Sequence, residues 1–303
     1  MNIFDILKGT EGDSDYCKKG VIVQGITGAY GSLHTKNMMS YGTNIVAGVT
    51  PSKGGQIFEG IPIHNTVQEA VDATGANISI VFVPAKFFKN AAIEALNAGI
   101  KLLVAIPEHV PVRDTMEVIR LAKEKGVTVI GPNTPGVMIP EIIKIGIMPH
   151  MPFKSGNVAV ISKSGTLLYE ISDALSAANF GQCITIGIGG DPINGTRLVD
   201  AFDMVKDLPS LEGLVIVGEI GGDSEELLAQ RIMELNFTKP TVAYIAGRAA
   251  PKGKRMGHAG AIVMGTYGSA ESKVNMFNKA NVPVAKRPTE VPVLLAGKMK
   301  EFV

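Results

Sequence analysis

Short apolar runs alternate with longer segments of helical period along most of this chain. The runs predict strands over residues 21–23, 45–49, 78–83, 102–106 and 127–130, and again over 158–161, 184–188, 214–217 and 241–245. Helices are expected up to about residue 41, over 66–73, 89–98 and 114–125, from about 166 and from about 196, and over 224–235 and 270–280. Strands this uniformly apolar are buried on both faces, which predicts parallel sheets covered by helices, an α/β fold.

The pattern breaks over residues 140–156, where Pro140, Pro149, Pro152 and Gly156 interrupt it. A connection of this composition is typical of a domain boundary. We therefore expect two successive doubly wound domains, residues 19–150 and 151–303. Residues 1–18 are polar, and we expect them to form an irregular extension.

Composition narrows the class of protein. A chain of 303 residues with 46% hydrophobic and 19% charged residues fits a well-packed globular enzyme. The net charge of +1 makes nucleic acid an unexpected partner. Two distant cysteines, Cys17 and Cys183, form neither a disulfide framework nor a metal-spaced cluster. The start of the chain resembles no signal peptide and no apolar run suits a bilayer, so we expect a cytoplasmic protein.

A glycine-rich turn follows the first expected strand, with Gly25, Gly28 and Gly31 before a helix. Such a turn lets the backbone approach an anion at the helix N-terminus. Its spacing is G-x-x-G-x-x-G rather than the G-x-G-x-x-G of dinucleotide sites, and Lys53 follows the second strand in place of an acidic residue. A lysine suits an additional phosphate, such as the 3′-phosphate of coenzyme A (CoA). CoA is therefore favoured over NAD, and a tight turn without a ligand is the other interpretation.

A second anion-binding turn is expected in the second half. Ser162-Lys163-Ser164-Gly165-Thr166 follows a strand and begins a helix, so its hydroxyl and N–H groups suit a phosphoryl group. Ile161 precedes Ser162, and the G-x-S-x-G pattern of serine hydrolases is absent from this turn, which disfavours a serine nucleophile.

His258 is the strongest candidate for chemistry. It lies in a glycine-bearing loop after three cations, Lys252, Lys254 and Arg255. A phosphorylated imidazole needs positive charge, room for a tetrahedral group and a mobile support. One ring nitrogen attacks phosphorus while an acceptor holds the other. Glu219, which follows the strand at 214–217, is the expected acceptor because such sites form at the carboxyl ends of parallel strands.

Seven blocks carry a family resemblance: residues 24–31, 48–55, 130–136, 162–169, 187–192, 218–222 and 251–260. In this order they resemble the α subunit of succinyl-CoA synthetase, from about Val21 to Val284. The resemblance implies a Rossmann-like CoA-binding domain followed by a flavodoxin-like, doubly wound ligase domain. It also implies a three-step reaction, in which a nucleotide phosphorylates histidine, a carboxylate takes the phosphoryl group, and CoA displaces phosphate.

The resemblance also implies roles for individual residues. His258 matches the phosphohistidine and Glu219 its orienting carboxylate. The residues matched to CoA binding are Thr27, Gly28, Ala29, Tyr30, Lys53, Ile106, Pro107 and Glu108. Those matched to the phosphate are Ser164, Gly165 and Thr166, and those matched to the substrate side are Tyr169, Asn133 and Thr134.

Three features depart from the family pattern. Thr134 stands where many members have cysteine, and the extension before Val21 is longer than in familiar bacterial relatives. Arg197 stands where those relatives tend to have a neutral residue. It is either a solvated cation at a helix start or a group that recognises the additional carboxylate or hydroxyl of citrate or malate.

A nucleotide-binding module is missing from the sequence, which has no G-x-x-x-x-G-K-[ST] loop. We therefore expect a β subunit whose ATP-grasp domain supplies ATP or GTP and Mg²⁺. The alternatives to a succinate-specific enzyme are a citrate- or malate-CoA ligase subunit, a non-catalytic CoA-sensing or scaffold protein, and an NAD(P)-dependent oxidoreductase.

Overall fold

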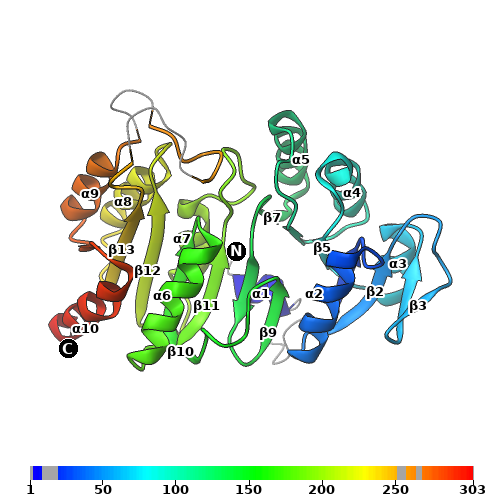
Figure 1. The fold of residues 1–303 in the computed structure, drawn as a ribbon, viewed down its shortest axis with the longest axis horizontal. Helices are drawn as coiled ribbons and strands as arrows, with labels where there is room; N and C mark the ends of the chain where they lie inside the picture. The colour runs from blue at the N-terminus through cyan, green and yellow to red at the C-terminus, as the bar shows by residue number, and fades with distance from the viewer. Residues whose placement is uncertain (1–2, 9–19, 251–256, 264–267, 303) are drawn as a thin grey trace. The chain divides into compact units, whose positions relative to one another are not determined.

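The computed structural model describes residues 3–8, 20–250, 257–263 and 268–302, which are drawn in colour in Figure 1. The chain forms two compact units. The first comprises Met1–Met148 and Ile193–Thr196, and the second comprises Pro149–Pro192 and Arg197–Val303.

The sheet of the first unit has the strand order of a Rossmann domain. Its strands are β1 (Val21–Gln24), β2 (Ile45–Val49), β3 (Ile57–Phe58), β4 (Ile61–His64), β5 (Ile78–Val81), β6 (Leu102–Ala105) and β7 (Thr128–Ile130). They lie in the order β3-β4-β2-β1-β5-β6-β7. Edge strand β3 pairs antiparallel with β4, and the other pairs are parallel. If β3 is left out and the other six strands are numbered along the chain, their order in the sheet is 3-2-1-4-5-6. The order therefore reverses between β1 and β5.

Helices α2 (Ala29–Ser40), α3 (Val67–Thr74), α4 (Ala85–Asn97) and α5 (Val112–Lys125) pack on this sheet. A short helix, α1 (Ile3–Lys8), precedes them in the chain. Helix α3 is capped at its start by Thr66, whose hydroxyl accepts the Glu69 N–H, and at its end by Gly75 in the left-handed conformation. Phe88 and Val118 join the strands in one buried apolar cluster.

Two elements of the first unit differ from the sequence prediction. The expectation of an irregular start is wrong for residues 3–8, because α1 is a helix whose Ile3, Ile6 and Leu7 are buried. The chain from 136 to 146 forms an antiparallel hairpin of β8 (Gly136–Ile139) and β9 (Ile143–Gly146) where no strand was expected. Pro140 lies in its turn, which is why the connection was mistaken for an irregular segment.

The second unit has the strand order of flavodoxin. Its strands are β10 (Ser155–Ser162), β11 (Gln182–Gly187), β12 (Gly213–Glu219), β13 (Thr241–Ala246) and β14 (Val284–Ala285). They lie in the order β14-β13-β12-β10-β11, and all these pairs are parallel. Numbered along the chain and read from β11, this is 2-1-3-4-5, which reverses between β10 and β12. The predicted α/β fold class is confirmed for both units.

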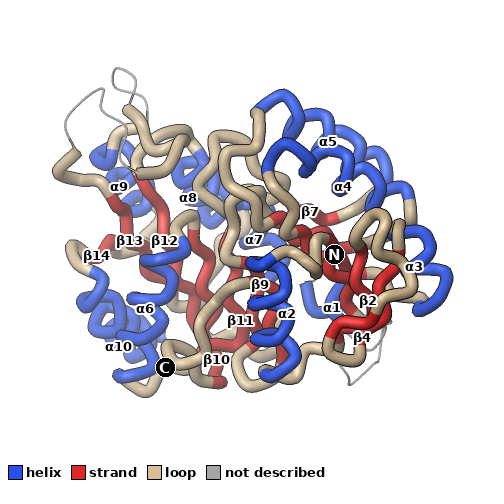
Figure 2. The backbone as a smooth tube through the Cα atoms, turned by 45° about the vertical axis from the view of Figure 1, so that its right-hand side comes forward, coloured by secondary structure: helices blue, strands red, loops and turns tan. Residues whose placement is uncertain are grey.

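Two groups of helices pack on the second sheet. The helices are α6 (Gly165–Ala177), α7 (Leu198–Val205), α8 (Ser224–Glu234), α9 (Ala270–Lys279) and α10 (Val291–Phe302), with a 3₁₀ turn, η1, at Pro288–Glu290. Helix α10 packs on α6, while α7, α8 and α9 pack in sequence, so the strands lie between helices (Figure 2). Among the residues described, no helix combines the length and apolarity needed to cross a bilayer.

Candidate active site

His258 and Glu219 meet at the carboxyl end of the second sheet, beside the point where the strand order reverses. Glu219 is the last residue of β12, and its Oε2 lies 2.7 Å from Nδ1 of His258. The carboxylate is buried, with 6% of its side chain exposed, whereas 29% of the imidazole is exposed. Because a carboxylate only accepts, Nδ1 carries the proton in this pair. The lone pair of a neutral ring is therefore on Nε2, the nitrogen free to act as a nucleophile.

The surroundings of His258 raise its pKa above the usual value. The hydrogen bond to Glu219 is the largest cause, and partial burial of the ring acts in the opposite direction. The charge of Asp191 also raises the pKa, and that of Lys163 lowers it. Gly190 lies against the face of the ring, so that a Cβ atom there would come within 2.3 Å of Cγ of the imidazole.

A cluster of buried charges lies behind the His258–Glu219 pair. Lys163 follows β10 directly, and its Nζ lies 3.9 Å from Glu219 Oε1 and 3.5 Å from Glu225 Oε1. Fully buried Glu225 also accepts the backbone N–H of Glu219 at 3.0 Å. Lys273 of α9 pairs with Glu225 and, at 3.0 Å, with Glu226. Burial is the largest influence on the pKa of Glu225 and raises it, but the two lysines outweigh burial and lower this pKa.

The residues of this cluster were missed by the sequence prediction. Lys163 stands within the turn singled out as an anion site, but nothing in the pattern distinguishes a buried lysine from a solvated one. Glu225 and Lys273 lie on helices with many charged residues, and only their burial reveals them.

The start of α6 offers backbone N–H groups beside Lys163. The Ser164 hydroxyl accepts the Leu167 N–H at 3.4 Å and so caps the helix. The buried Ser162 hydroxyl donates to the Ser164 carbonyl at 2.6 Å and accepts its N–H at 3.1 Å. These hydroxyls therefore shape the turn. The N–H groups of the first helical turn, at Gly165 and Thr166, have no carbonyl partner within the helix and suit an anion.

The glycine turn of the first unit has the close backbone packing that the sequence indicated. Gly25 has a φ of +83°, and a Cβ atom on Gly31 would lie 2.2 Å from the Gly25 carbonyl oxygen. Helix α2 begins at Ala29, and Gly28 before it provides no side-chain cap. The first N–H groups of α2 are therefore available to a ligand, as a phosphate site requires.

Side chains from neighbouring strand ends surround this turn. Lys53 donates to the Thr27 hydroxyl at 3.3 Å, which brings the predicted lysine to the glycine turn. Tyr30 is half exposed, and its pKa is raised first by burial and then by the charge of Glu108, which therefore lies nearby. A cation, free N–H groups and an aromatic side chain at one sheet edge fit a phosphate-bearing ligand such as CoA.

The remaining CoA-side and substrate-side candidates are placed as follows. Ile106 is buried at the end of β6, and the Pro107 carbonyl accepts the Asn133 N–H at 2.9 Å. Thr134 is buried and accepts the Gly136 N–H at 2.9 Å. Tyr169 belongs to the second unit, where its ring packs edge-to-face on Phe153 at a centroid distance of 6.2 Å.

Two further expectations concern cations. Lys252, Lys254 and Arg255 lie outside the described residues, so their expected place beside His258 stays a prediction. Arg197 precedes α7, and its guanidinium pairs with Asp200 through Nε at 3.1 Å and Nη2 at 3.3 Å. The side chain is 58% exposed, which is the geometry of a solvated cation at a helix start.

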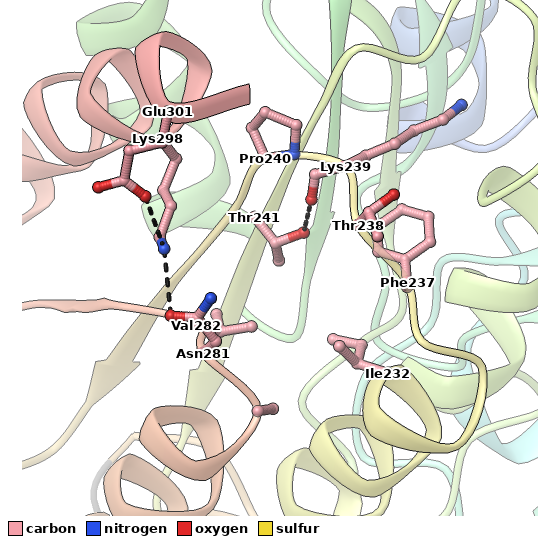
Figure 3. Close-up of a pocket in the computed structure, with 11 residues that line it drawn as sticks. Ile232, Phe237, Thr238, Lys239, Pro240, Thr241, Asn281, Val282, Lys298 and Glu301 are labelled. Atoms are coloured by element: carbon pink, nitrogen blue, oxygen red, sulfur yellow. Dashed lines mark hydrogen bonds and ion pairs between the residues drawn. The ribbon is translucent and has the colours of Figure 1, made fainter. Parts of the chain in front are cut away.

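A separate pocket of about 270 Å³ opens at the other end of the second sheet (Figure 3). It is lined by Ile232, Phe237, Lys239, Thr241, Asn281 and Lys298, among others. Thr241 begins β13, whereas Glu219 ends the parallel neighbour β12, so the pocket is remote from His258. Lys298 donates to Asn281 at 3.2 Å and to Glu301 at 3.1 Å, as the dashed lines show. We therefore do not assign this pocket to the active site.

Comparison with known proteins gives consistent matches. A family model described as a CoA binding domain matches residues 17–109, and one described as CoA-ligase matches residues 161–282. The ADP-forming succinate–CoA ligase subunit alpha of Staphylococcus epidermidis is 47% identical over 281 residues, which are 93% of each chain. Its counterpart in Staphylococcus aureus is 46% identical over 281 residues, again 93% of each chain.

Solved structures with the same fold include larger enzymes. ATP citrate lyase from Methanothrix soehngenii, in complex with citrate and coenzyme A, matches with a TM-score of 0.85 at 24% identity, over 94% of this chain and 50% of that one. The dinucleotide forming acetyl-coenzyme A synthetase 1 of Ca. Korarchaeum cryptofilum has a TM-score of 0.74 at 20% identity, over 93% and 61% of the two chains. The chain thus spans about half the length of the lyase, and these likenesses show the fold alone.

Proposed function

The chain belongs to the family of succinate–CoA ligase α subunits, and from this premise we propose that it carries the phosphohistidine and binds CoA in such a ligase. The proposed overall reaction joins succinate to CoA at the expense of ATP or GTP, and it is reversible. The observation that carries the proposal is the pairing of His258 Nδ1 with buried Glu219, which leaves Nε2 of the partly exposed ring as the nucleophile.

The proposed reaction has three balanced steps. Nε2 of neutral His258 attacks the γ-phosphorus of the nucleotide, and the nucleoside diphosphate leaves. A carboxylate oxygen of succinate then attacks the phosphohistidine, which gives succinyl phosphate and restores the imidazole. Finally, the CoA sulfur attacks the acyl carbon, the C–O bond to phosphate breaks, and the leaving inorganic phosphate takes up the thiol proton.

The residues of this chain supply binding and orientation in these steps. Glu219 fixes the ring and stabilises the positive charge that develops on it during attack. The N–H groups of Gly165 and Thr166 suit the phosphoryl group at the start of α6. Thr27, the first N–H groups of α2 and Lys53 suit the phosphates of CoA. We propose that Asn133, Thr134 and Tyr169 act on the substrate side.

The proposal requires a partner. We infer that a β subunit with an ATP-grasp domain holds the nucleotide and Mg²⁺, because the sequence contains no phosphate-binding loop of the G-x-x-x-x-G-K-[ST] type. The isolated chain is then expected to bind CoA without catalysing ligase turnover. Full ATP- and CoA-dependent turnover by this chain alone would contradict the inference.

A citrate- or malate-CoA ligase is the second candidate, because Arg197 is a departure from the family pattern. The guanidinium of Arg197 is occupied by Asp200 at the start of its own helix, which favours a capping role over substrate recognition. We therefore propose succinate, and not citrate or malate, as the acid substrate.

The test combines the chain with a succinate–CoA ligase β subunit and γ-labelled ATP. We expect an acid-labile, base-stable label on His258 that is lost on addition of succinate and CoA. The variant His258→Asn is the matched control and should remain unlabelled. Absence of label from the wild-type complex would refute the function, and turnover with citrate or malate instead of succinate would select the second candidate.

A further inference from the structure

Lys163 lies between two buried carboxylates at the reversal point of the second sheet. Its side chain is 11% exposed, and its ammonium faces Glu225 at 3.5 Å and Glu219 at 3.9 Å. Burial of an ammonium is costly unless carboxylates compensate it. The other oxygen of Glu225 is already paired with Lys273. The two carboxylates therefore hold the Lys163 ammonium in place. Through them, Lys163 connects the Glu225–Lys273 pair to the Glu219–His258 pair.

The two oxygens of Glu219 have different neighbours. Oε2 accepts from His258 at 2.7 Å, whereas Oε1 is buried and accepts no hydrogen bond among the described residues. Lys163 is the cation within ion-pair distance of Oε1. Within the described parts of the chain, Glu219 thus divides its ion pairing between an imidazole and an ammonium.

This division matters because a carboxylate beside an imidazole has two opposing effects. It orients the ring, but it also stabilises the protonated form, in which neither nitrogen has a lone pair for attack. A histidine that must accept a phosphoryl group has to be held and still be neutral near pH 7. A second cation on the carboxylate weakens the stabilisation of the imidazolium without moving the hydrogen bond.

We propose that Lys163 is a positioning residue for His258: its ammonium shares the charge of Glu219, so that the carboxylate orients the imidazole without fixing it in the protonated form. The inference rests on the proposed function of His258 as phosphoryl carrier. It assigns to the lysine of the Ser162–Thr166 turn a role in reactivity that is separate from phosphate binding.

Charged groups reach His258 from several elements. Glu219 comes from β12, Lys163 from the turn after β10, and Asp191 from the loop after β11. Glu225, Glu226 and Lys273 lie one contact further away, on α8 and α9. Lys163 lowers the pKa of His258, whereas Glu219 and Asp191 raise it. Among the described residues, Lys163 is therefore the cation that opposes the effect of these carboxylates on the pKa of His258.

The direct test is an NMR titration of the full chain with ¹³C at Cε1 of its five histidines. The His258 resonance is assigned with His258→Asn. Replacement of Lys163 by Met keeps the aliphatic stem and removes the charge, so the pKa of His258 should rise by about half a unit to one unit. Lys163→Arg, which keeps the charge, should return the pKa to the wild-type value. Lys298→Met, at the far end of the sheet, is the matched control and should leave it unchanged.

A second readout follows the phosphorylation of the α–β complex against pH. In Lys163→Met the acidic limb of the rate profile should move to higher pH by the same amount, while the rate at pH 9 stays near wild type. Lys163→Gln, which is neutral but polar, replaces the methionine variant if that variant does not fold. An unchanged or lowered pKa of His258 in the neutral variants would overturn the proposal. The titration needs no nucleotide or partner, so its result is independent of whether His258 is phosphorylated.

Discussion

Gly190 provides a steric test of the active-site geometry. A Cβ atom at this position would lie 2.3 Å from Cγ and 2.4 Å from Nδ1 of His258. The φ of Gly190 is not in the left-handed region, so alanine suits the backbone and the perturbation falls on the ring. Gly190→Ala should therefore displace the imidazole while the fold is retained.

The size of the effect follows from these distances. Ordinary contacts of a Cβ atom begin at 3.4 Å, so the ring must retreat by about 1 Å. The same movement would lengthen the 2.7 Å bond from Nδ1 to Glu219 beyond hydrogen-bonding distance, because the buried carboxylate has little room to follow. A hydrogen bond to a charged group is worth about 1.5–3 kcal/mol, which corresponds to a loss of about 10- to 160-fold in the rate of phosphorylation.

The assay is the initial rate of phosphohistidine formation from γ-labelled ATP by the α–β complex, measured together with CoA affinity and melting temperature. Gly297→Ala is the matched control, because a Cβ atom on that helical glycine would meet no atom within 4 Å. We expect the control to be phosphorylated at the wild-type rate. Wild-type phosphorylation of Gly190→Ala would show that the ring does not occupy this position during the reaction.

Four other predictions follow from the structure. Lys53→Met should weaken CoA binding about 10-fold in calorimetry, because one charge-assisted phosphate contact is lost; unchanged affinity would exclude Lys53 from the site. Arg197→Gln should leave the KM for succinate within about twofold, since an exposed, locally paired guanidinium contributes little, and a large increase in KM would revive the citrate or malate candidate. Burial raises the pKa of the Cys183 thiol to about 11, so Cys183 should resist alkylation at pH 7.5 in the native protein and should react in urea-unfolded protein. Rapid alkylation of native Cys183, located by mass spectrometry, would contradict this. The pKa of His258 is raised mainly by Glu219, so their pairing contributes stability that is fully present below the unfolded pKa of the histidine and is lost as pH rises through its folded pKa. The difference in melting temperature between wild type and Glu219→Gln should therefore shrink from pH 6 to pH 9. A difference that grows over this range would contradict the pairing.

Most strands could be predicted from the sequence because each is a compact apolar run buried on both faces. The expected run 45–49 coincides with β2, and 214–217 lies within β12. The strands β3 and β14 escaped prediction because each is only two residues long, and β4 escaped it because Pro62 interrupts its apolar residues. Helix α4 begins at Ala85, before the expected start at 89, because Pro84 fixes the entry to the helix.

Some residues of the candidate site could likewise be predicted from the sequence, and others could not. His258 and Glu219 could be paired from sequence, because the end of a parallel strand and a glycine-bearing loop each restrict where a side chain can lie. Lys163, Glu225 and Lys273 could not, since their importance depends on burial and on contacts between segments that are distant along the chain. Gly190 belongs to the family block at residues 187–192, but the sequence does not show why a glycine is needed there. The structure does, because the His258 ring leaves no room for a Cβ atom.

The buried charges of the second unit have a consequence for the maturation of the protein. They come from two strand ends and two helices that separate crossovers bring together, and contacts of this kind close late because long loops must be ordered first. In a partly folded chain we expect these lysines and glutamates to stay hydrated and apart, which would leave the imidazole without an oriented partner. We therefore expect the capacity to accept phosphate to emerge only with the last tertiary contacts, which would make histidine labelling a sensitive reporter of refolding yield.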